Sequence, residues 1–121
     1  MAAQVIADRR DIDFVLHEQF QAGDLSRHER YAEFNSKTID LVVSEARTLA
    51  VKELLPCMGE ADEQGCTFEK GQVRVPEMFH RLHDLFCQGE WIAMSDAPDW
   101  GGQAMPAIVA LAANNYFNGA N

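Results

Sequence analysis

The sequence predicts an all-α fold, an up-and-down bundle of helices with one short hairpin or irregular excursion near residues 66–75. Three observations predict it. Apolar residues recur at helical spacing over several stretches, prolines and glycines mark the ends of those stretches, and strand-like alternation is confined to 67–75. The 121 residues suffice for one compact unit with its own core.

The first helix is expected over Asp11–Phe20, with its first residue available as the cap. One face of this segment is apolar and holds Ile12, Val15, Leu16 and Phe20. Gly23 then breaks the pattern. The spacing of Ser26 and Glu29 is that of a capping box, which predicts a second short helix through about Phe34.

The strongest periodicity predicts a long helix that starts at Asn35 or Ser36 and runs to Pro56. Its stripe consists of Ile39, Val42, Val43, Ala46, Leu49, Ala50 and Leu54. Only Glu53 interrupts the apolar character of that stripe, while charged residues cover much of the remaining surface. Proline is poorly tolerated inside helices, so Pro56 marks the expected end or kink.

Between Gly59 and Val75 the sequence becomes acidic and rich in glycine. We expect the first part of this stretch to be a solvated acidic loop. The segments 67–68 and 73–75 can pair as a small hairpin around 70–71, where a glycine favours a tight turn.

The next helix is expected to open at Pro76 and to close at Gly89. Its apolar stripe holds Phe79, Leu82, Leu85 and Phe86. A last helix should begin at Met105 and Pro106, with a stripe that uses Ile108, Leu111, Ala112 and Tyr116. Its many alanines should let it approach neighbouring helices closely.

A dense turn separates these two helices. Within it, Pro98 fixes one backbone angle and Asp99 can bond its own backbone two residues on. Gly101 and Gly102 permit left-handed backbone angles that other residues rarely adopt. The sequence therefore predicts a turn of defined shape that leads into the last helix.

This turn, with Pro98, Trp100, Gly101, Gly102 and Gln103 ahead of a helix started by proline, resembles the N-terminal helical domain of the acyl-CoA dehydrogenase family. Upstream segments agree. The acidic stretch 59–65 resembles the link after the family's long helix, and 66–76 resembles the excursion into the next one. The segment 11–20 resembles an extra N-terminal piece found in one branch of the family.

The resemblance implies an organisation as well as a fold. It makes 1–34 an N-terminal helical extension and 35–121 the family's N-terminal helical domain, truncated before the FAD-binding β-domain. Members bind FAD through a later β-domain and helical bundle, which also carries the catalytic glutamate. We therefore expect this chain to hold no catalytic, cofactor-binding or metal-binding residue, and the five turn residues to have a structural role.

The resemblance also implies a function for the parent protein: flavin-dependent oxidation of the CH–CH group of acyl-CoA thioesters, as in fatty acid metabolism. In the family this domain supplies scaffold and one wall of the acyl pocket, and the last helix is the first place to look. The expected partners are the remaining domains, acyl-CoA in the full protein, and a second copy. The isolated chain is expected to be inactive and to bind no FAD.

Composition excludes several other classes. The net charge of −9, from 19 acidic and 10 basic residues, disfavours nucleic acid, because phosphates would be repelled. No window approaches the roughly 20 apolar residues of a membrane span, and Asp8, Arg9 and Arg10 interrupt the place of a secretory leader. Three cysteines without a Cys-x-x-Cys pair fit reduced thiols, so we expect a cytoplasmic location.

Two alternatives stay open. The first is a stand-alone acidic helical module that docks a partner through an apolar face. The second is a small redox or metal protein that uses Cys57, Cys66, Cys87 and His80. Glu77 and His80 make a single Glu-x-x-His, whereas di-iron bundles need two, so we expect a solvated helix face there. No sequence neighbour activates a thiol, and packed, inert thiols are expected at Cys57 and Cys87.

Overall fold

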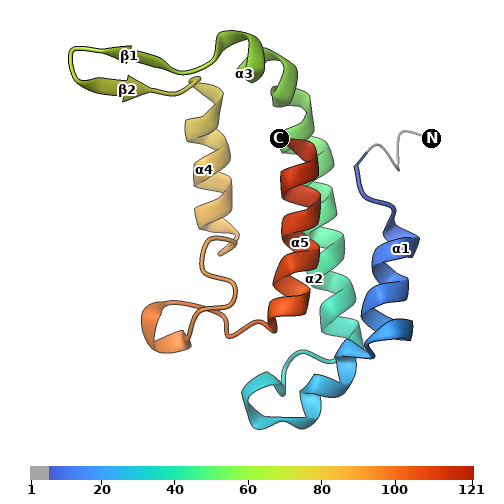
Figure 1. Ribbon diagram of the computed structural model, residues 1–121. Coiled ribbons are helices and arrows are strands. Elements are labelled where there is room, and N and C mark those ends of the chain that lie inside the picture. The colour runs from blue at the N-terminus through green and yellow to red at the C-terminus, as the bar shows by residue number, and fades with distance from the viewer. Residues whose placement is uncertain (1–5) are drawn as a thin grey trace.

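The computed structural model describes residues 6–121 and is predominantly helical, which confirms the predicted all-α class (Figure 1). Its helices are α1 Arg9–Asp13, α2 Ser36–Leu49, α3 Met58–Gln64, α4 Met78–Gln88 and α5 Ala107–Ala120. Its strands are β1 Thr67–Glu69 and β2 Gln72–Arg74. Figure 1 shows that α1, α2, α4 and α5 alternate in direction along the chain.

The central element is α5, which packs on α2 and runs parallel to it, between α1 and α4 (Figure 1). Both helices present small or branched side chains to each other, and the fully buried positions are Ile39, Ala46, Ala50, Val109, Ala113, Tyr116 and Ala120. The alanines let the backbones approach closely, so large neighbours can fill the space between them. This pair of helices forms the middle of the core.

The first helix starts earlier than predicted. Asp8 caps α1, because its carboxylate accepts a hydrogen bond of 2.8 Å from the backbone N–H of Arg10. The expectation of a cap at Asp11 is therefore wrong: Asp11 lies within the first turn, where an acidic residue is favoured by the helix dipole without capping. The helix continues as a wider π-helical turn over Phe14–Gln19.

The predicted capping box is also wrong. The hydroxyl of Ser26 donates a hydrogen bond of 2.7 Å to the carbonyl oxygen of Gly23, so it caps no helix that follows. Such bonds between a serine and a nearby backbone group compete with helix formation. The chain forms short 3₁₀ turns over Ala22–Arg27 and Glu29–Tyr31 in place of a second helix.

The long helix begins where predicted, with the Asn35 side chain accepting a bond of 3.0 Å from the N–H of Thr38. It does not end at Pro56. A π-helical turn and a 3₁₀ turn lead without a break into α3, so the acidic loop expected from Gly59 is helical up to Gly65. Proline would break a regular α-helical hydrogen bond. The π-helical and 3₁₀ turns have different hydrogen bonding, so helical structure continues across Pro56.

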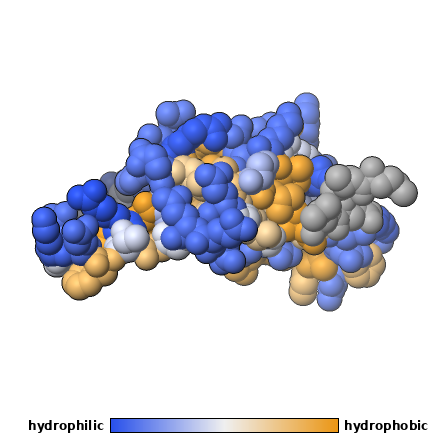
Figure 2. All heavy atoms as spheres, turned by 90° about the horizontal axis from the view of Figure 1, so that it is seen from above, coloured by the Kyte–Doolittle hydropathy of each residue, from blue (hydrophilic) through white to orange (hydrophobic). Residues whose placement is uncertain are grey.

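The hairpin is confirmed, with Phe68 opposite Val73. Lys70 and Gly71 both have left-handed backbone angles, as a tight two-residue hairpin turn requires. Figures 1 and 2 show the hairpin reaching out from the helices at the left, and its two apolar residues are exposed.

The outer helices attach to the central pair by different contacts. Phe117 of α5 meets Phe86 of α4 and the following Trp91 edge to face, with ring centroids 4.8 and 5.2 Å apart. On the other side, Ile12 and Leu16 are buried against the core. The predicted helix between Pro76 and Gly89 is confirmed as α4. None of the described helices is long and apolar enough to span a membrane.

Candidate functional site

The turn before α5 has the structural character that its sequence predicts. Pro98–Trp100 form a 3₁₀ turn, and Gly101 follows with a left-handed φ of 82°. At position 102, glycine is required for a different reason from the one expected, because the φ angle of Gly102 is not left-handed. A Cβ atom at Gly102 would lie 2.1 Å from the carbonyl oxygen of Asp96, so only glycine fits there.

Hydrogen bonds fix this turn to the end of α4. The side-chain amide of Gln103 donates a bond of 2.7 Å to the carbonyl oxygen of Glu90. The N–H of Met105 donates to the carbonyl oxygen of Met94 at 2.9 Å. These bonds set the start of α5, which begins at Ala107, one residue after Pro106. The turn thus sets where α5 begins. Trp100, within the turn, is exposed.

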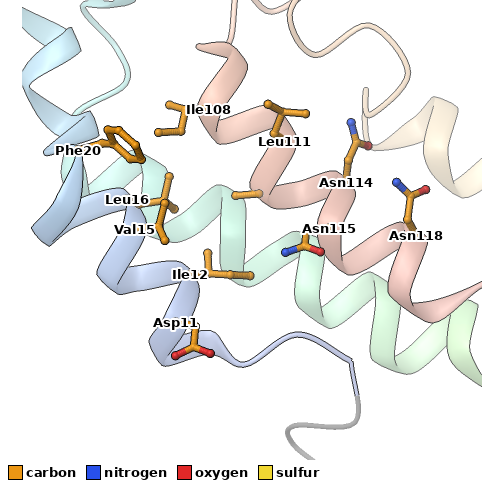
Figure 3. Close-up of a pocket in the computed structure, with 11 residues that line it drawn as sticks. Asp11, Ile12, Val15, Leu16, Phe20, Ile108, Leu111, Asn114, Asn115 and Asn118 are labelled. Carbon is orange, nitrogen blue, oxygen red and sulfur yellow. The ribbon is translucent and has the colours of Figure 1, made fainter.

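A groove of about 560 Å³ lies between α5 and the N-terminal helical segment (Figure 3). Its walls are mostly apolar, and the larger apolar residues are Ile12, Val15, Leu16, Phe20, Ile108 and Leu111. Its polar lining consists of three amides of α5, Asn114, Asn115 and Asn118, and the carboxylate of Asp11, and Ala112 is its remaining apolar residue. Figure 3 shows the apolar side chains of both segments gathered between the two ribbons.

A second groove, of about 390 Å³, lies on the other side of α5 against α4. Its lining includes Phe79, Leu82, His83, Phe86 and Ile92. Asn114 and Asn118 line both grooves, so they stand on the ridge that separates them. We call the ridge and the wall of the first groove beside it the outer face of α5, defined by Ile108, Leu111, Asn114, Asn115 and Asn118.

The outer face combines apolar surface with amides that have no partner. Leu111 is 67% exposed on it. Among residues 6–121, the side-chain amides of Asn114 and Asn118 make no hydrogen bond. Asparagine is a weak helix former, so helix propensity gives no reason for two of them one turn apart. An exposed apolar surface with unpaired amides is typical of an interaction site, where a partner surface would supply both apolar contacts and hydrogen-bonding groups.

Sequence reasoning missed a polar network between α1 and α2. His17 Nε2 lies 2.7 Å from Asp40 Oδ1, and Arg9 lies 2.7 Å from Asp13 and 3.7 Å from Asp40. The i,i+4 spacing of Asp13 and His17 was the available signal. Atoms of Asp13, His17 and Asp40 all lie within 4.8 Å of one another. Arg9 already supplies positive charge to both carboxylates, so the arrangement works as an ion-pair network that holds α1 on α2.

Tyr116 lies fully buried between the helices, and its hydroxyl has no hydrogen-bond partner. Burial raises the pKa of the Tyr116 hydroxyl, and the nearby cations Arg9 and Arg47 partly oppose that rise. A neutral phenol in this position is inert toward acid-base chemistry near neutral pH. We assign it to packing.

The cysteines and the candidate metal residues are spread over the molecule. Cys57 is partly buried, and Cys66 and Cys87 are exposed free thiols. Glu77 and His80 are both exposed at the start of α4. Two expectations are wrong for Cys87. Its side chain is exposed and not packed, and a base lies near its thiol, because Sγ lies 3.7 Å from Nδ1 of His83. Their i,i+4 spacing on a helix would have revealed this pair.

No protein-family model matches the chain. The chain is similar to the 3-methylmercaptopropionyl-CoA dehydrogenase of Ruegeria pomeroyi, with 25% identity over 112 residues. The matched segment covers 93% of this chain and 19% of that enzyme, so the chain spans about a fifth of its relative's length. The similarity supports a relationship with the acyl-CoA dehydrogenase family at the level of the family only.

Proposed function

We propose that this chain is the N-terminal helical part of an acyl-CoA dehydrogenase-like flavoenzyme and that it contributes scaffold and one wall of the acyl pocket. The single observation that carries the proposal is the outer face of α5. A long apolar helix lies at the centre of the molecule, yet Leu111 on the wall of the first groove and two unpaired amides on the ridge face solvent. A surface of this kind favours a role as an internal wall in a larger protein.

The similarity to a larger dehydrogenase supports the same reading. The relative has about five times the length of the matched segment, and its additional length would supply the domains that cover α5. The apolar walls suit the hydrocarbon part of an acyl group, while Asn114, Asn115 and Asn118 can donate to and accept from polar groups beside it. On this proposal residues 1–34 remain an extension, held to α2 by the ion-pair network.

The two grooves do not fit FAD by themselves. Neither lining contains a lysine or arginine that could neutralise the diphosphate of the cofactor. In the proposed parent the flavin would accept a hydride from the β carbon of the acyl thioester, and other domains would hold it. We therefore assign no step of that chemistry to residues of this chain, and the isolated chain should bind no FAD.

A chimera tests the proposal. In the Ruegeria pomeroyi enzyme, the segment that matches this chain is replaced by residues 1–121, and flavin content and dehydrogenase turnover are measured. We expect both to be retained. Leu111→Asp in the chimera should remove them, because a buried unpaired charge is strongly unfavourable. Leu41→Asp is the matched control: Leu41 is 58% exposed on α2 and lines neither groove.

Two results would contradict the proposal. One is equal flavin content and turnover in the Leu111→Asp and Leu41→Asp chimeras. The other is turnover of acyl-CoA by the isolated 121-residue chain. Circular dichroism of both variants in the isolated chain controls for folding, since each substitution lies on exposed surface.

A stand-alone acidic interaction module is the second candidate. The observation that favours it is the exposed hairpin, on which Phe68 and Val73 lie opposite each other in solvent. The complete gene separates the two readings. An in-frame continuation into a β-rich region favours the dehydrogenase, and a stop codon directly after Asn121 favours the module.

A further inference from the structure

We propose that His83 and Cys87 form a chelating pair for a borderline-soft divalent cation, with zinc as the probe, on the exposed side of α4. This inference does not depend on the acyl-CoA proposal. Nothing in the fold requires the pair, because both side chains are exposed and lie outside the buried core. Thiolate and imidazole are the protein ligands that zinc prefers.

The separation of the two side chains suits a single metal ion. Sγ of Cys87 lies 3.7 Å from Nδ1 and 3.9 Å from Nε2 of His83. Zinc binds sulfur at about 2.3 Å and imidazole nitrogen at about 2.0 Å, so tetrahedral ligands of these kinds lie about 3.5 Å apart. The observed separation is close to that value, and because the two ring nitrogens lie at nearly equal distances from Sγ, a rotation of the imidazole would aim one of them at the ion.

The backbone that carries the pair is held in place. Both residues belong to α4, which packs on the core through the adjacent residues Leu82 and Phe86. Residues four apart on a helix lie on the same side, so the pair is pre-organised by the helix itself. Two protein ligands leave the remaining positions of a tetrahedral ion open to water.

The polar network around His17 is a weaker candidate for the same ion. It offers two carboxylates and one imidazole, but Arg9 lies 2.7 Å from Asp13 and competes with any cation. Among residues 6–121, no cation is paired with the thiol of Cys87, and sulfur favours zinc over the hard cations that carboxylates hold. We therefore place the zinc at α4.

Calorimetric titration of zinc chloride into the reduced 121-residue chain tests the proposal. We expect one zinc per chain. His83→Ala and Cys87→Ser should each weaken binding at least about tenfold, because even outer-shell partners of a metal contribute that much. Two matched controls should leave the affinity unchanged: Cys66→Ser removes another exposed thiol, and His17→Ala removes the imidazole of the polar network.

Cobalt gives an independent readout of the ligands. The wild-type chain with cobalt should show a thiolate-to-metal charge-transfer band, and Cys87→Ser should abolish it. The proposal is overturned if the wild-type chain binds no zinc, if Cys87→Ser or His83→Ala binds it as tightly as wild type, or if His17→Ala alone abolishes binding. Circular dichroism of each variant confirms that the helices remain folded.

Discussion

The two faces of α5 differ sharply although they belong to one helix. Toward α2, the side chains of Val109, Ala113 and Tyr116 are fully buried. On the outer face, Leu111 is exposed on the wall of the first groove. The burial of the inner face stabilises the folded chain. The exposed side chain of Leu111 contributes little to that stability, and an exposed apolar surface of this kind is typical of an interaction site.

Truncation of a buried aromatic residue tests the contrast most strongly. Phe117 is 5% exposed and packs against Phe86 and Trp91. Phe117→Ala should lower the free energy of unfolding by about 3–5 kcal/mol. Leu111→Ala, on the outer face, should change it by less than about 0.5 kcal/mol. Urea denaturation of both variants measures the difference, and equal losses would remove the distinction between the faces.

The turn that sets the start of α5 should be the next most sensitive place. Gly102→Ala puts a Cβ atom against the backbone of Asp96 and should destabilise the chain by about 1–3 kcal/mol. Gly59→Ala is the control, because Gly59 lies in α3 with open space around its Cβ position. That change should stabilise by about 0.5 kcal/mol. Thermal unfolding that ranks the two variants in the opposite order would refute this account of the turn.

The unpartnered hydroxyl of Tyr116 sharpens the description of the inner face. Tyr116→Phe removes a buried group without a hydrogen bond and should leave stability equal or raise it by up to about 1 kcal/mol. The same change alters the response to alkaline pH. The pKa of Tyr116 is raised in the folded chain above its unfolded value of about 10. The resulting contribution to the free energy of unfolding is therefore complete below the unfolded pKa and is lost as the pH rises through the pKa of the folded chain.

Unfolding free energies measured from pH 8 to 11 should therefore fall more steeply for wild type than for Tyr116→Phe. Parallel curves would mean that the hydroxyl is accessible to water in the folded chain.

The smallest effect is expected where the N-terminal segment meets α2. Arg9→Met removes the cation that joins Asp13 and Asp40 while keeping much of the apolar stem. The loss should be below about 1 kcal/mol, because the guanidinium is partly exposed. Salt should reduce the loss further. A loss that does not change with salt would mean that Arg9 acts through packing instead of charge.

Periodicity and punctuation were enough to predict the helices around Ile39 and Leu82, the existence of the last helix, and the hairpin at Lys70-Gly71. The apolar stripe expected on the last helix was wrong apart from Tyr116, because Leu111 is exposed while Val109 and Ala113 are buried. They failed where two local options compete. Asp8 and Asp11 are both plausible caps, and Ser26 binds the turn before it, which spacing does not reveal. The irregular turns that carry the helical path through Pro56 depend on packing of the long helix, which no local pattern encodes.

The candidate site was less predictable than the fold. The resemblance directed attention to the last helix, but its two grooves arise from segments that are far apart in the sequence. The walls come from three separate segments, 12–20, 79–92 and 108–118, which the fold brings together. The pair of His83 and Cys87 is different, because its helical spacing was visible from the sequence and was overlooked.

Solvent footprinting of α5 tests the central claim most directly. Carbene labelling of the isolated chain and of the chimera, read by mass spectrometry, reports how exposed each side chain is. We predict that Leu111 and Ile108 label strongly in the isolated chain and are protected in the chimera, while Leu41 labels equally in both. Persistent labelling of Leu111 in a folded, flavin-containing chimera would contradict the claim that the outer face of α5 is covered in the parent enzyme.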